Sequence, residues 1–164
     1  MHPGQDRMFA ALPLAVAVAS MSGCGDADTG SPATVTAATL GAQELRSTAE
    51  YLAREPYISA DTRNGEKLAA QCRACHTLTT GGTHGIGPGL HGIFGRQAGG
   101  ARDFDYSAAL QDSEFHWTPR ALDAWLASPY EFLPGNRMTF AGIADATDRV
   151  DLVAYLLTET GAEQ

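Results

Sequence analysis

Three stretches after residue 60 place apolar residues at the spacing of a helix face. The first follows Asp61, which can cap a helix, the second follows Thr118 and Pro119, an N-cap and first-turn pair, and the third follows Asp145. Pro129 ends the second stretch. The apolar positions are Leu68, Ala69 and Cys72, then Leu122, Trp125 and Leu126, then Val150, Val153, Ala154 and Leu157. Because no alternating strand pattern accompanies them, the sequence predicts an all-α domain with long loops between its helices.

The first 24 residues carry a different pattern, in which a charge, an apolar run and small residues follow one another. Arg7 precedes the apolar run 8–19, and small residues then lead to Cys24. This order is typical of an export signal. A membrane span needs about 20 apolar residues, so the run is short for a retained anchor helix, which stands as the alternative.

Met21-Ser22-Gly23-Cys24 resembles the lipobox of bacterial lipoproteins, in which the cysteine is acylated and becomes the new N-terminus. Met21 stands where that motif usually has leucine. The alternative interpretation of Cys24 is a free thiol near a cleavage site. On either interpretation, residues 1–24 predict an exported protein.

Residues 25–60 are rich in Ala, Thr, Gly and Ser and carry little apolar content. Such a segment does not bury enough surface to fold alone, so we expect a flexible tether. A short helix is expected from Gln43 to Arg54, and Pro56 ends it. The folded domain is then expected to span residues 61–164.

The chain is acidic, with a formal net charge of −8, and Lys67 is its only lysine. A field of this sign argues against nucleic acid as a partner and favours a selective protein partner.

The candidate chemistry centres on Cys72-Arg73-Ala74-Cys75-His76. Two thiols three residues apart lie on one side of a helical turn, where both can form thioether bonds to the vinyl groups of one porphyrin. The histidine that follows is then held under the metal, and Cys-x-x-Cys-His is the pattern of c-type haem attachment. A thioredoxin-like dithiol would instead follow a strand. A zinc site would need two more ligands at short spacing, and no cysteine follows Cys75.

An iron held by histidine on one side commonly receives Met, His, Tyr or Cys on the other. Of the four methionines, only Met138 lies outside the export segment. It occupies an extended loop between apolar residues, and its alternative role is to fill a gap in the core. The rival histidines are His84, His91 and His116.

Residues 65–158 resemble a class I, mitochondrial-type cytochrome c in its acidic bacterial form. Besides the haem-attachment motif, the matching pieces are Gly65-Glu66-Lys67-Leu68, Gly87 to Arg96, Phe104-Asp105-Tyr106, Leu133 to Ile143, and Asp151 to Leu156. The resemblance implies the cytochrome c fold, in which three main helices and long loops wrap around one covalent haem c. It also implies axial ligation of the iron by His76 and Met138.

The same resemblance assigns roles to further residues. Pro88 would offer its carbonyl to the ring of His76, which orients that ligand. Phe140 would cover the haem edge beside Met138, and His91 would bond loop backbone. The haem propionates would meet an arginine and two aromatics with polar tips, namely Arg96, Tyr106 and Trp117.

Two positions depart from the family near the methionine. Trp125 stands where a tyrosine often lies near the sulfur, and Leu110 replaces a polar residue that is often asparagine. A drier pocket disfavours the extra charge of ferric iron, so we expect a raised midpoint potential.

The lysines that surround the haem edge in mitochondrial relatives are missing here. The matching positions include Gln71, Tyr130, Glu131, Ala144 and Asp145, with Arg137 the main positive residue. Residues 61–164 carry 8 Lys and Arg against 13 Asp and Glu, a net charge of −5. Because charge complementarity governs steering, we expect a basic or largely apolar docking site on the partner, or membrane tethering that substitutes for attraction.

The function implied is that of a one-electron carrier, not an enzyme, with no catalytic residue and no small-molecule substrate. The resemblance implies transient docking in a respiratory chain, between a quinol-oxidising cytochrome complex and a terminal oxidase or other reductase. The place implied is the periplasmic side of a bacterial membrane, with anchoring through the N-terminal region. The alternatives are a haem peroxidase or gas-binding sensor with a labile methionine ligand, and a fixed cytochrome subunit of a larger oxidoreductase.

Overall fold

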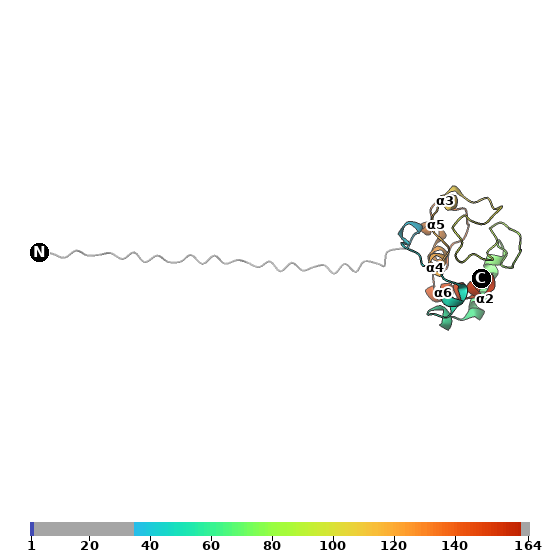
Figure 1. Cartoon of the computed structure of the whole chain (residues 1–164), viewed down its shortest axis with the longest axis horizontal. Coiled ribbons are helices and arrows are strands. Elements are labelled where there is room, and N and C mark those ends of the chain that lie inside the picture. Colours follow the sequence, from blue (N-terminus) through green and yellow to red (C-terminus); the bar gives the residue numbers. More distant parts are fainter. Residues whose placement is uncertain (2–34, 162–164) are drawn as a thin grey trace. The chain divides into compact units, whose positions relative to one another are not determined.

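The computed structural model describes Met1 and residues 35–161 (Figure 1). The expected export signal, the lipobox at Cys24 and the first part of the expected tether lie outside the described residues. None of the helices in the described part of the chain is both long and apolar enough to span a membrane.

Three main helices carry the domain, as the apolar pattern predicts. They are α2 (Thr62–Arg73), α4 (Pro119–Ala127) and α6 (Ala146–Thr160), joined by long loops and the short helices α3 (Ala108–Gln111) and α5 (Pro129–Phe132). Within the described ranges the only strand-like pairing is an isolated bridge between Gln97 and His116. The all-α prediction is confirmed for this part of the chain.

The main helices begin at the caps that the sequence indicates. The carboxylates of Asp61 and Asp145 each accept hydrogen bonds from the amides two and three positions later. The hydroxyl of Thr118 accepts from the amide of Ala121, and Pro119 occupies the first turn. These bonds satisfy amides that the first turn of a helix leaves without partners.

Helices α2 and α6 pack directly against each other (Figure 1). Gly65 permits the contact, since a Cβ there would overlap the carbonyl of Asp151 and lie 2.7 Å from the Cβ of Tyr155. The carboxylate of Asp151 is 5% exposed, yet it accepts from the Asp61 amide at 2.8 Å and from the Asn64 side chain at 2.9 Å. The buried charge is therefore well supplied with donors, as a buried carboxylate requires.

An aromatic cluster fills the space between α4, α5 and the loop before α4. Phe115 and Trp125 each meet Trp117 and Phe132 edge to face, with ring centroids 4.9 to 5.9 Å apart. Such geometry adds to the apolar burial. The cluster therefore packs the loop before α4 tightly against α4 and α5.

Residues 35–60, which we call the N-terminal strap, differ from the tether expected over residues 25–60. They contain η1 (Ala37–Thr39), α1 (Thr48–Leu52) and η2 (Tyr57–Ser59), and both α1 and η2 contact α6. Leu40 is only 3% exposed. Leu40, Tyr51 and Tyr57 of the strap join or pack against the core of the domain, so this segment folds against that core. The expected helix 43–54 is shortened to α1.

Candidate functional site

A cavity of about 500 Å³ lies at the centre of the domain, within the size range of ligand sites. All ten residues that the sequence analysis singled out line it: Cys72, Cys75, His76, Pro88, Arg96, Tyr106, Trp117, Trp125, Met138 and Phe140. The remaining walls are chiefly apolar and include Leu90, Ile93, Leu122, Leu126 and Leu156. The fold therefore gathers the candidates from the end of α2, from α4 and from three loops.

The cysteine motif begins in the last turn of α2 and continues through the turn that follows the helix. The amides of Cys75 and His76 both donate to the carbonyl of Cys72, at 3.1 and 2.9 Å, and both cysteines are free thiols. Burial raises the pKa of the Cys72 thiol, which is opposite to the lowered pKa of a reactive dithiol. The motif presents two thiols to the cavity.

The ring of His76 is held in one orientation. Its Nδ1 lies 2.6 Å from the carbonyl of Pro88, and because a carbonyl only accepts, Nδ1 carries the proton. Nε2 is then left with its lone pair. Gly87 packs against the ring, where a Cβ would lie 2.7 Å from Nδ1 and 2.8 Å from Nε2. Burial lowers the pKa of His76, so the neutral imidazole that a metal requires is favoured.

Met138 reaches the cavity from the loop after α5, and Asn136 fixes that loop. The side-chain oxygen of Asn136 accepts from the Met138 amide at 2.9 Å, while its nitrogen donates to the carbonyls of Pro129 and Leu133, both at 2.9 Å. The sequence analysis missed Asn136. The signal was its place in Pro134-Gly135-Asn136, a cluster of turn-forming residues.

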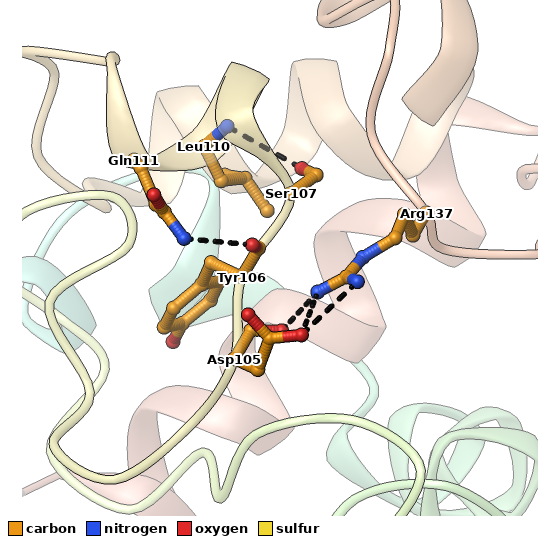
Figure 2. Close-up of polar contacts among 6 residues, drawn as sticks. All are labelled: Asp105, Tyr106, Ser107, Leu110, Gln111 and Arg137. Atoms are coloured by element: carbon orange, nitrogen blue, oxygen red, sulfur yellow. Dashed lines mark hydrogen bonds and ion pairs between the residues drawn. The ribbon is translucent and has the colours of Figure 1, made fainter.

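Arg137 links the methionine loop to the segment on the other side of the cavity mouth. Figure 2 shows its guanidinium reaching both the carboxylate and the carbonyl of Asp105. The next residue, Tyr106, is held through its carbonyl, which accepts from Gln111 at 2.9 Å. The ion pair is largely exposed, with 58% of the Arg137 side chain and 86% of the Asp105 side chain accessible. This ion pair therefore joins the two segments without burying a charge.

The polar end of the cavity holds a cation with an unused donor. The Nε of Arg96 is buried and has no hydrogen-bond partner among the described residues, although its other nitrogens reach the carbonyls of Gly89 and His91 at 3.0 and 3.4 Å. Burial lowers the pKa of Arg96 and raises that of Tyr106. A buried donor without a partner is costly, and an anionic group at this end would satisfy it.

The rival histidines lie elsewhere, since none of the three lines the cavity. The expectation that His91 bonds loop backbone is wrong. His84 has that role, because its Nε2 meets the carbonyl of Arg102 at 2.7 Å and its Nδ1 accepts from the amide of Gly89 at 2.9 Å. Among the described residues, the ring of His91 meets only the Thr80 hydroxyl within hydrogen-bond range, at 3.4 Å.

A family model described as cytochrome c matches residues 62–160. The chain belongs to the cytochrome c family. Cytochrome c of Trypanosoma brucei brucei is 50% identical over 78 residues, which cover 48% of this chain and 84% of that protein. The cytochrome c-type cyt cy of Rhodobacter capsulatus is 39% identical over 102 residues, which cover 62% of this chain and 50% of that protein. The solved structure of cytochrome cH from Methylobacterium extorquens is 41% identical, with a TM-score of 0.56, and covers 60% of this chain and 99% of that one.

The fold is accordingly that of a class I cytochrome c, and the cofactor is a covalently bound haem c. The cavity fits such a group on its own evidence. It offers apolar walls, two free thiols, a neutral imidazole and one unsatisfied guanidinium nitrogen. The family's activity is electron transport.

Proposed function

We propose that this cytochrome c carries single electrons through a haem attached at Cys72 and Cys75 and ligated by His76 and Met138. The haem, when bound, takes up and releases one electron. What carries the proposal is the placing of His76 and Met138 on one cavity, with the His76 Nε2 free to ligate. Two side-chain ligands would leave no open iron position for a substrate, which favours a carrier over an enzyme.

The surrounding residues support a pocket that holds its geometry. Pro88 keeps the imidazole oriented and strengthens it as a donor. Trp125, 5% exposed, contributes an indole that donates but does not accept hydrogen bonds. With Leu110 also on the wall, the methionine end is apolar. Such a pocket disfavours the ferric charge, which raises the midpoint potential.

The other end of the pocket suits the haem propionates. Arg96, Tyr106 and Trp117 line it, and the free Nε of Arg96 is the strongest single indication of an anion there. Two of the three side chains also have pKa values shifted by burial. Partly desolvated carboxylates require a cation and hydrogen-bond donors of this kind.

The mouth of the cavity indicates how partners dock. Ile86 lines the cavity and is 82% exposed, Phe140 is half-buried beside it, and the charges of Arg137 and Asp105 neutralise each other. A brief contact there would be largely apolar, and small interfaces are typical of redox encounters. We propose respiratory partners on the periplasmic side of a bacterial membrane, a quinol-oxidising complex and a terminal oxidase, with the N-terminal region as anchor.

The ligand set is tested on the exported, haem-loaded protein. Met138→Ala should abolish the sulfur-to-iron absorption band and let the reduced protein bind carbon monoxide rapidly. His116→Ala is the matched control, because it removes a rival ligand that does not line the cavity, and the band should stay. An unchanged spectrum in the Met138→Ala protein would overturn the proposal, as would a pigment that acidified solvent extracts.

The docking proposal is tested by the salt dependence of electron transfer. Transfer to a partner with an acidic docking face should be slow at low salt and speed up as salt screens the repulsion. Transfer to a basic or apolar partner should not show that rise. Acceleration at low salt with the acidic partner would contradict the proposal.

A further inference from the structure

Gln43 of the N-terminal strap is bonded to both backbone groups of His116. Its Nε2 donates to the His116 carbonyl at 2.7 Å, and its Oε1 accepts from the His116 amide at 2.8 Å. The same nitrogen lies 3.3 Å from the hydroxyl of Thr118. The carboxamide therefore acts towards His116 as the peptide group of an adjoining strand would.

The His116 carbonyl also accepts from the Thr118 amide at 2.9 Å, whereas the His116 amide has no protein partner other than Gln43 in the described part of the chain. On the opposite edge, residues 115–117 pair with residues 95–98. The Trp117 amide donates to the Arg96 carbonyl and the Gly95 amide to the Trp117 carbonyl, both at 2.9 Å. The Ala98 amide donates to the Phe115 carbonyl at 2.8 Å. In such pairing the backbone groups of alternate residues point away from the partner strand, so the His116 amide would be unpaired without Gln43. Half-buried backbone groups of this kind need partners.

The strap is seated firmly at this point. Leu40 is buried three residues before Gln43, and a guanidinium nitrogen of Arg120 donates to its carbonyl at 3.2 Å. The strap also lies outside residues 62–160, where the family model matches. The contact thus joins a segment outside the matched range to the matched domain.

We propose that Gln43 is a positioning residue for the polar end of the haem pocket. Arg96 and Trp117 both line the cavity and are joined to each other by backbone bonds, and Gln43 secures the residue next to Trp117. The inference rests on the proposed function in one respect, that the haem propionates meet Arg96 and Trp117. Loosening this pair leaves the propionate charge less compensated. The uncompensated charge stabilises ferric iron and lowers the midpoint potential.

The test uses the full-length, haem-loaded protein with Gln43→Ala and Gln43→Met. The Gln43→Met variant keeps the side-chain volume without the hydrogen bonds, so the potential can still be measured if the Gln43→Ala variant loads haem poorly. Gln97→Ala is the matched control, since Gln97 is an exposed glutamine in the same strand pairing, and within the described residues its side chain donates only to the Ser113 carbonyl, at 3.4 Å. We expect both Gln43 variants to lower the reduction equilibrium constant about threefold, or about 28 mV at the one-electron scale of 59 mV per tenfold.

Two further readouts separate positioning from a structural role. The His116 amide should exchange with solvent faster in both Gln43 variants and not in Gln97→Ala. The pH dependence of the potential should shift as the propionate pKa rises. Faster exchange with an unchanged potential would overturn the inference, and so would unchanged exchange. If the wild-type protein lacked the sulfur-to-iron band, the proposed ligation would fail, whereas the potential difference would still decide the role of Gln43.

Discussion

The two sides of the cavity are held by different kinds of contact. On the histidine side, residues 72–90, a helix end, backbone hydrogen bonds and a glycine packed on the ring fix His76. On the methionine side, residues 133–143, Met138 itself is fixed through the Asn136 side chain and an exposed ion pair, and the loop is bonded to α5 at Pro129 and to α4 at Leu126. Exposed ion pairs contribute only about 0.2–1 kcal/mol. Of the two proposed ligands, Met138 is therefore the one that the fold holds less tightly.

Gly87→Ala should have the largest effect, because it attacks the histidine side where the packing is closest. Its Cβ would overlap the imidazole of His76, and we expect a loss of about 3 kcal/mol in the free energy of unfolding of the haem-loaded protein. Denaturant unfolding measures it. Gly81→Ala is the control, since Gly81 has open space and a φ of +68°, and the strained conformation alone costs about 1–2 kcal/mol. Equal losses would show that ring packing does not specify this side.

Asn136→Ala tests whether one side chain governs the methionine side. It removes three hydrogen bonds around Met138, and we expect a loss of about 2 kcal/mol together with a weakened sulfur-to-iron band. Asn64→Ala is the matched control, because the Asn64 side chain also makes hydrogen bonds, two of them, but these join α2 to α6. That control should lower stability and leave the band intact. A band that both variants preserve would contradict the comparison.

Leu110→Asn asks whether dryness on the methionine side sets the potential. A polar group on this wall should admit water and favour ferric iron, lowering the reduction equilibrium constant about fivefold, equivalent to about 1 kcal/mol. Redox titration measures the change. Leu110→Ala keeps the wall apolar and should leave the potential nearly unchanged. If the asparagine variant also kept its potential, the dry-pocket explanation would be wrong.

Asp105→Asn should have the smallest effect, because it removes only the exposed charge pair with Arg137. We expect imidazole to displace Met138 about threefold faster, within the range of about 0.2–1 kcal/mol for such pairs. The difference should shrink as salt rises. Asp103→Asn removes a charge from the same loop and should leave the displacement rate unchanged. A salt-independent effect would mean that the ion pair is not the cause.

Local signals carried most of the sequence predictions. The caps at Asp61, Thr118 and Asp145, and the cysteine motif, depend on neighbours a few residues away, which periodicity and turn chemistry report well. The docking of the strap was missed because composition averages over a segment. Its seat depends on particular residues such as Leu40 and on Gln43, which binds a residue 73 positions away.

The roles of the loop histidines show the same limit. His84 lies within the glycine-rich stretch 81–89 and His91 just after it, and nothing in the local pattern tells their roles apart. The three-dimensional path of the loop brings the Arg102 carbonyl and the Gly89 amide to His84. Family resemblance therefore supplied the candidate ligands, whereas the contacts that support them required coordinates.

The docking of residues 35–60 onto the domain also limits the reach of any lipid attached at Cys24. Only the ten residues 25–34 lie between that cysteine and the strap, and at full extension they span at most about 35 Å. A cytochrome fastened in this way would be confined to a thin layer above the bilayer. It would meet only those complexes whose electron-accepting surface lies within that layer.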